Sequence, residues 1–257
     1  MASFGKVLPD DWDRHWERYQ DSAVTNPAQG YRRRLIVAEL DLAHAREPRV
    51  LDIGSGLGDL LIDVHAEFPQ AKMVGLELSR AGVDIATRRL PQAQFLQCDL
   101  IAGNADPGNL RGFGTHAVCS EVLEHVDDPV GLLRSARAYM ADGCRLVVTV
   151  PGGPRSAYDR HIGHRRHFSA ADLQAVLEEA GFQVEIATGA GFPFFNLYRL
   201  LVILRGQRLV EDAAGKPSAL LTYVSAAFRG LFALNLPRSS LGWQTVAVAR
   251  KISRLRY

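Results

Sequence analysis

The sequence predicts an α/β fold in which a mostly parallel sheet of seven strands carries helices on both faces. From residue 47 onward, short apolar runs alternate with segments of helical periodicity, a pattern typical of parallel strands joined by crossover helices. A glycine-spaced turn, Gly54-Ser55-Gly56-Leu57-Gly58, directly follows the first apolar run. The chain has 257 residues, 47% of them hydrophobic, which suits one such domain with an insertion.

Each strand is predicted from a short apolar run that has turn residues at its ends. We expect the strands at residues 50–53, 72–77, 94–97, 115–120, 145–150, 182–187 and 243–249. Residues 145–150 are apolar except for Thr149, as expected of a strand buried on both faces.

Helix starts are predicted by capping residues between these strands. Ser79 precedes one helix, and Asp128 with Pro129 precedes another. Ser169 with Asp172 three residues later is typical of a capping box. Upstream of the first strand, Trp12, Trp16 and Tyr19 recur at helical spacing, and residues 31–45 are expected to form a second helix.

We divide the chain into four segments: a helical cover at 1–46, an α/β core at 47–190, a helical insertion at 191–241, and the last strand with its tail at 242–257. The insertion is predicted to contain helices at 192–206 and 218–234, separated by the polar stretch 211–217. It is far longer than a usual connection. A substrate lid, a homodimer face, a peripheral membrane contact through residues 192–208 and a core-packing hairpin all remain open as its role.

Composition narrows the class of protein. Three cysteines, Cys98, Cys119 and Cys144, fall in or beside predicted strands, which favours reduced thiols and a cytoplasmic setting. The start of the chain lacks the features of a signal peptide, and no apolar run is long enough to span a bilayer. The formal net charge of +2 does not favour nucleic acid as a partner.

Acidic residues stand at the ends of consecutive strands, next to the glycine turn. Asp52 lies at the end of the first strand, Glu77 ends the second, and Asp99 follows the third. A carboxylate at the place of Glu77 can accept hydrogen bonds from both hydroxyls of a ribose. The G-x-G-x-G spacing after Leu51-Asp52-Ile53, together with these acids, resembles the class I S-adenosylmethionine-dependent methyltransferases.

The resemblance implies a Rossmann-like sheet whose seventh strand runs antiparallel between the fifth and the sixth. It also implies a site for S-adenosylmethionine. The expected cofactor residues are Arg34, Asp52, Gly54, Ser55, Gly56, Gly58, Glu77, Leu78, Asp99, Leu100, Ser120 and Glu121. Arg34 is chosen from the run Arg32 to Arg34, since an arginine near here can pair with the cofactor's carboxylate in related enzymes.

The segment from Cys119 to Pro129 resembles the ubiquinone-biosynthesis O-methyltransferases and their small-molecule relatives. In that group, residues that match Glu121, Glu124 and His125 have been assigned to a divalent metal, which implies a Mg²⁺ site here. On one helical turn these three side chains would face one point. A role for His125 as a catalytic base, and a purely structural role for the acids, are the alternatives.

The loop after the fifth strand carries three histidines at a spacing of three: His161, His164 and His167. The family places substrate-facing residues in this loop, and His164 is the expected catalytic residue among them. Pairing of the neighbouring arginines with surface acids is the alternative.

These observations predict methyl transfer from S-adenosylmethionine to a small or lipid-linked molecule, most readily at a hydroxyl oxygen. A small-molecule N-methyltransferase and a catalytically silent cofactor-binding scaffold are the alternatives. A nicotinamide oxidoreductase would need glycine at the place of Asp59, and an aminopropyl transferase would need paired aspartates at the places of Glu121 and Glu124.

Overall fold

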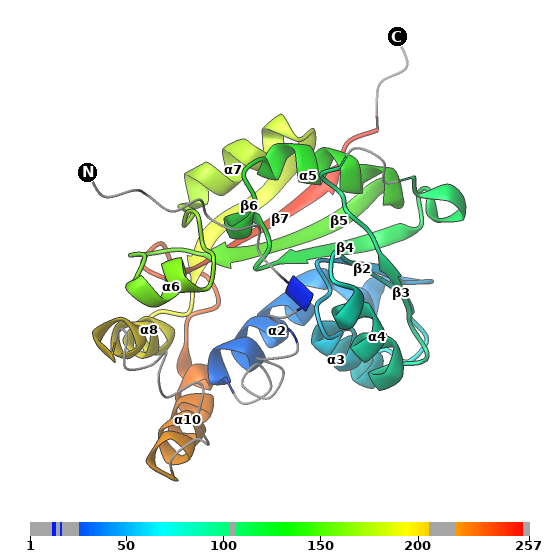
Figure 1. Ribbon diagram of the computed structural model, residues 1–257. Helices are drawn as coiled ribbons and strands as arrows, with labels where there is room; N and C mark the ends of the chain where they lie inside the picture. The colour runs from blue at the N-terminus through cyan, green and yellow to red at the C-terminus, as the bar shows by residue number, and fades with distance from the viewer. Residues whose placement is uncertain (1–11, 14–15, 17–25, 103–105, 206–218, 254–257) are drawn as a thin grey trace, which may run out of the picture.

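The computed structural model describes residues 12–13, 16, 26–102, 106–205 and 219–253 (Figure 1). Its centre is one seven-stranded sheet in the order β3-β2-β1-β4-β5-β7-β6. The strands are β1 (Arg49–Ile53), β2 (Lys72–Glu77), β3 (Gln94–Gln97), β4 (Gly114–Ser120), β5 (Met140–Pro151), β6 (Phe182–Ala190) and β7 (Gln244–Lys251). Strand β7 pairs antiparallel with both β5 and β6, and the other pairs are parallel. The predicted fold is confirmed.

Helices alternate with the strands and cover both faces of the sheet (Figure 1). They are α2 (Pro27–Leu40), α3 (Asp59–Glu67), α4 (Arg80–Arg89), α5 (Pro129–Ala136), α6 (Ala157–His161), α7 (Ala170–Glu179), α8 (Phe194–Arg205) and α10 (Ala219–Leu231). Alternate strand residues point to opposite faces, so Val50 belongs to the core under α2 and α3, while Leu51 belongs to the core under α5 and α7.

The capping residues begin the helices that the sequence predicts. The Ser79 and Asp128 side chains accept hydrogen bonds from Gly82 N–H and Gly131 N–H, at 3.0 Å and 2.8 Å. Ser169 and Asp172 form the reciprocal capping box.

The bounds predicted for one helix and one strand differ most from those observed. Helix α2 begins at Pro27 because Asn26 caps it, and it ends at Leu40 because Asp41 adopts a left-handed conformation with φ 57°. Strand β5 begins at Met140, which pairs with Gly114 of β4 before the main register starts.

The insertion packs on α2 through aromatic rings. Tyr31 of α2 lies 5.4 Å from Phe195 and 5.5 Å from Phe232 between ring centroids, and Tyr198 lies 5.3 Å from Phe228. Helices α8 and α10 of the insertion are thus in contact with each other, and the insertion is in contact with α2. The polar stretch 211–217 lies outside the described residues. The division of the chain at residues 46, 190 and 241 stays a prediction. None of the helices in the described part of the chain is long and apolar enough to cross a membrane.

Candidate active site

The glycine turn between β1 and α3 has the conformation that the sequence requires. Gly54, Gly56 and Gly58 have φ angles of 72°, 53° and 78°, in the left-handed region that side chains disfavour. A Cβ at Gly54 would come within 2.3 Å of the Val122 side chain, so space as well as conformation demands glycine there. Within the turn, the N–H groups of Gly54 and Ser55 donate to the carbonyl of Leu76, that of Gly56 to the Glu77 carboxylate and that of Gly58 to the carbonyl of Ser55. These hydrogen bonds hold the turn in its conformation at the start of α3.

Glu77 at the end of β2 is held in place beside this turn. Its two carboxylate oxygens accept hydrogen bonds from Gly56 N–H at 2.8 Å and Ser79 N–H at 2.9 Å. Burial raises the pKa of Glu77, and these N–H donors, together with a hydrogen bond from the Trp16 indole, oppose that rise. Charge-assisted hydrogen bonds of this kind fix a carboxylate in one orientation.

The N-terminal residues that the structure describes lie over the same edge of the sheet. A Cβ placed on Gly56 would be 2.9 Å from the Trp16 ring. Asp13 accepts hydrogen bonds from the Ser79 hydroxyl at 2.5 Å and from Ala81 N–H at 3.1 Å. The predicted helical cover thus contacts both the glycine turn and the start of α4, while Tyr19 lies outside the described residues.

The remaining expected cofactor residues follow the same strand ends. Asp52 is buried within β1, and burial, followed by the charges of Glu77 and Asp59, raises its pKa to about 7. Asp99 is exposed after β3, where its carboxylate accepts from the N–H groups of Ile101 and Ala102. Of the other expected cofactor residues, Ser55 and Leu100 are buried as Asp52 is, and Leu78 is exposed as Asp99 is.

Arg32, and not the expected Arg34, reaches the site from α2. Arg34 is exposed, whereas the Arg32 guanidinium is buried and lies 3.1 Å from the Glu121 carboxylate. Arg32 also donates to the side-chain oxygen of Gln244 in β7 at 3.0 Å. Side chains that are two positions apart on a helix point in nearly opposite directions, so only one of Arg32 and Arg34 can face the sheet.

Glu121 is held separately from Glu124 and His125, contrary to the expected helical turn. It has a φ of 57°, and the segment that follows is a single 3₁₀ turn at Leu123–His125. Its carboxylate accepts from Gln244 at 3.0 Å, in addition to the ion pair with Arg32. Ser120, the expected cofactor residue at the end of β4, forms a hydrogen bond of 2.9 Å with the Thr149 hydroxyl of β5.

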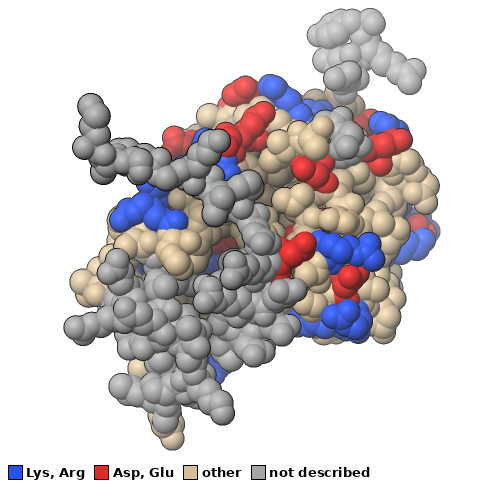
Figure 2. All heavy atoms as spheres, in the orientation of Figure 1, with Lys and Arg blue, Asp and Glu red and all other residues tan. Residues whose placement is uncertain are grey.

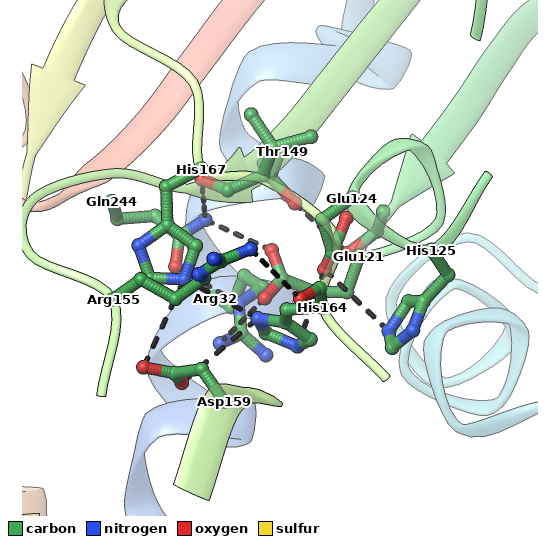
Figure 3. Close-up of polar contacts among 12 residues, drawn as sticks. Arg32, Glu121, Glu124, His125, Thr149, Arg155, Asp159, His164, His167 and Gln244 are labelled. Carbon is green, nitrogen blue, oxygen red and sulfur yellow. Dashed lines mark hydrogen bonds and ion pairs between the residues drawn. The ribbon is translucent and has the colours of Figure 1, made fainter. Parts of the chain in front are cut away.

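Glu124 instead faces two histidines in the interior (Figure 3). The side chain is fully buried, and in the part of the chain that the structure describes neither carboxylate oxygen has a hydrogen-bond partner. Its Oε1 lies 3.9 Å from Nε2 of His125 and 3.9 Å from Nε2 of His164. Burial, followed by the charge of Glu121, raises the pKa of Glu124 well above its usual range. The protonated form of this carboxyl is thus favoured over the carboxylate.

His164 comes from the loop between α6 and α7 and is nearly buried. Its backbone N–H donates to Asp159 at 2.9 Å, and Arg165 N–H donates to the carbonyl of Glu124 at 2.8 Å, so the loop is fastened to the 3₁₀ turn. Burial, followed by the charge of His125, lowers the pKa of His164 to about 3. His164 is therefore a neutral imidazole at neutral pH.

Asp159 and Arg199 are part of this arrangement, and neither was expected from the sequence. Arg199 of α8 makes an ion pair of 2.9 Å with the fully buried Asp159, which also accepts from the N–H and hydroxyl of Ser156. Asp159 lies 3.9 Å from His164 Nδ1 and 3.8 Å from His167 Nε2. A lone arginine within the apolar run of α8 was the available signal, because a buried charge needs a partner.

Comparison with known proteins bears on this geometry. The model of the family described as "Methyltransferase domain" matches residues 28–186, which include the glycine turn, Glu77 and the Glu124 segment. The chain belongs to this methyltransferase family. Its sheet order and its relatives make it a class I S-adenosylmethionine-dependent methyltransferase, as the sequence predicts.

The relatives of this methyltransferase differ in acceptor. It is 32% identical to trans-aconitate 2-methyltransferase of Paracidovorax citrulli over 55% of this chain, and it spans only 50% of that relative's length. It is 25% identical to ubiquinone biosynthesis O-methyltransferase of Aeromonas salmonicida over 59% of this chain and 70% of the relative. A solved structure of phosphoethanolamine N-methyltransferase 2 from Haemonchus contortus, bound to S-adenosylmethionine, has a similar fold. That structure has a TM-score of 0.62 and 15% identity, with coverage of 98% of this chain and 61% of the other.

The residues of this methyltransferase do not fit the Mg²⁺ site that the resemblance implies. Among the described residues, the acid–histidine groupings compact enough for one ion are Glu124–His125–His164 and Asp159–His164–His167, and Glu121 is in neither. Each offers two imidazoles and one carboxylate, whereas Mg²⁺ prefers an octahedral shell of oxygen atoms. Asp159 is moreover occupied by Arg199 and Ser156. We therefore derive no step of the reaction through Mg²⁺.

Proposed function

We propose that this methyltransferase binds S-adenosylmethionine along the β1–β2 edge and transfers its methyl group to a hydroxyl oxygen of a small or lipid-linked acceptor. The observation that carries the proposal is Glu77, fixed by the N–H groups of Gly56 and Ser79 at the strand end next to the glycine turn. In that position the carboxylate can accept both ribose hydroxyls of the cofactor.

The residues of the chain have separate roles in the proposed reaction. The cofactor supplies an activated methyl group on a sulfonium. The glycine turn and Glu77 hold its nucleoside part, and Arg32, near the end of β4, offers a cation to a carboxylate ligand. Since the donor is already activated, alignment of the acceptor and exclusion of water account for most of the remaining catalysis.

Acceptor activation is assigned to His164. A hydroxyl acceptor must lose its proton as the new bond forms, and a neutral imidazole can take it. Glu124 lies 3.9 Å from His164 Nε2, so its carboxyl faces the imidazolium that results. His125, the other catalytic candidate, lies at the same distance from the same oxygen. The name of the Aeromonas relative supports an oxygen acceptor.

The first test is calorimetric titration with S-adenosylmethionine and S-adenosylhomocysteine, before and after chelation and with Mg²⁺ added. We expect wild type to bind both ligands without added metal. Glu77→Ala should weaken binding about tenfold or more, since at least one charged hydrogen-bonding group is lost. Glu67→Ala, which removes an exposed glutamate of α3, is the matched control and should bind as wild type does.

The outcomes separate the alternatives. Absence of binding by wild type would overturn the proposal and favour a silent scaffold. Unchanged affinity in Glu77→Ala would remove that residue from the cofactor site. After binding is established, phenolic, lipid-linked hydroxyl and amine acceptors are compared by mass of the product. Methylation of amines alone would overturn the assignment to a hydroxyl acceptor and favour a small-molecule N-methyltransferase.

A further inference from the structure

Helix α8 presents a row of leucines to solvent on the side opposite the core. Leu197, Leu200, Leu201 and Leu204 follow one another at the spacing of one helix face, and between 41% and 73% of each is exposed. We call these four residues the leucine face. The opposite side of α8 carries the buried Phe195 and Val202, so the helix already has its core contact without these leucines.

Further exposed leucines gather next to the leucine face. Leu236 pairs by a backbone bridge with Phe192, just before α8. The carbonyl of Leu241 accepts a hydrogen bond at 2.7 Å from Asn196 in the first turn of α8. Both leucines are more than half exposed. Contiguous exposed apolar surface of this kind marks contact with a membrane or with another protein.

The charge of the insertion distinguishes between a membrane and another protein as the partner. Residues 191–241 contain six Lys or Arg and two Asp or Glu, a formal net charge of +4, whereas the whole chain carries +2. The rest of the protein is therefore slightly acidic, and Figure 2 shows acidic and basic side chains intermixed over its visible surface. Arg199 and Arg238 are paired with Asp159 and Glu39 outside this segment, so four basic and two acidic residues remain, an excess of two positive charges. A basic, apolar element suits an anionic lipid surface, whereas two copies meeting here would bring like charges together.

The leucine face is linked to the reaction centre through the same helix. Arg199, on the inner side of α8, makes the ion pair with Asp159, and Asp159 lies within 4 Å of ring nitrogens of both His164 and His167. Figure 1 shows α8 beside α6, at the end of the molecule away from β3. A surface bound to the leucines would thus lie one helix away from the histidine loop.

We propose that α8 docks this methyltransferase, through its leucine face, on the surface of an anionic bilayer, and that its acceptor is a hydroxyl carried by a lipid. An amphipathic helix that lies in the interface plane needs no span of the membrane. The second half of the proposal rests on the proposed function, whereas docking itself does not.

The test is co-sedimentation with vesicles of phosphatidylcholine, with and without phosphatidylglycerol. We expect wild type to bind the phosphatidylglycerol vesicles at least about tenfold more tightly, and added salt to weaken that binding. The double variant Leu201→Gln/Leu204→Gln should lose about tenfold or more, since glutamine keeps helix propensity and removes apolar area. The matched control Ile101→Gln/Ile252→Gln alters two exposed apolar residues outside the insertion and should bind as wild type does.

Each possible result supports or overturns docking of the leucine face on a bilayer. Equal vesicle binding by wild type and the leucine double variant, or no binding by wild type, would overturn docking. A wild-type dimer in sedimentation velocity that the leucine double variant dissociates would assign the leucine face to a second copy. Titration of the same samples with S-adenosylhomocysteine keeps the two proposals apart. Vesicle binding without cofactor binding would leave docking intact and overturn the methyltransferase reaction.

Discussion

Two buried glutamates, one on each side of the site, have opposite surroundings. Glu77 on the cofactor side is 5% exposed, and each of its oxygens accepts a backbone N–H. Glu124 on the proposed acceptor side is 0% exposed, and neither of its oxygens has a hydrogen-bond partner among the described residues. Two imidazole nitrogens lie 3.9 Å from its Oε1, too far for a hydrogen bond.

The difference indicates how the work of the enzyme is divided. A carboxylate with fixed donors is preorganised to bind, and its protonation state does not need to change. The pKa of a carboxyl that lacks donors and lies beside two imidazoles is sensitive to any charge that appears nearby. Pairs of titratable groups whose surroundings separate their pKa values are typical of acid–base centres.

The largest expected effect concerns His164. His164→Gln should lower methyl transfer about a hundredfold or more, because it removes the base that accepts the acceptor's proton. S-adenosylhomocysteine affinity should stay within about twofold, since no contact of Glu77 changes. Rates and calorimetry on the same samples check this. His161→Gln, an exposed histidine of the same loop, is the control, and an equal loss of rate in both variants would contradict the assignment.

An isosteric pair of variants tests the comparison directly. Glu77→Gln places an NH₂ group against a backbone N–H and should weaken S-adenosylhomocysteine binding about tenfold, the cost of one unsatisfied buried donor. Glu124→Gln should leave that affinity and the melting temperature near wild type, because burial raises the pKa of this carboxyl and so favours its uncharged form, which glutamine resembles. It should still slow methyl transfer. A Glu124→Gln variant that binds cofactor poorly would show that the two sides are not independent.

The local geometry of the proposed cofactor side was predictable because its residues lie close together in sequence. The turn from Gly54 to Gly58 and its strand partners at Glu77 and Asp99 follow from strand ends that a parallel sheet must bring to one edge. Local pattern also predicts the caps at Ser79, Asp128 and Ser169, and the resemblance implies the order of the strands. For this side, the resemblance and the spacing lead to the same residues.

The acceptor side depends on contacts between distant parts of the chain. Arg32 meets Gln244 across 212 positions, and Arg199 meets Asp159 across 40. Periodicity cannot choose among Arg32, Arg33 and Arg34, since the helix phase at Asn26 decides which one faces the sheet. Likewise the left-handed φ of Glu121 separates it from Glu124, although a helical turn predicts that they meet.

The smallest expected effect is on the pH dependence of folding stability. His164 has a pKa near 3 in the folded chain, because of its burial and the charge of His125, against about 6.5 for an unfolded histidine. Between these values the unfolded chain holds the extra proton, so acid lowers the free energy of unfolding through this window, while above about pH 6.5 the contribution is constant. The slope from this one residue is on the order of 1 kcal/mol per pH unit just below pH 6. Urea unfolding at several pH values should show a shallower slope in His164→Gln than in wild type or His161→Gln. Parallel slopes in all three proteins would mean that His164 is hydrated and titrates normally, and the contrast with Glu77 would then rest on Glu124 alone.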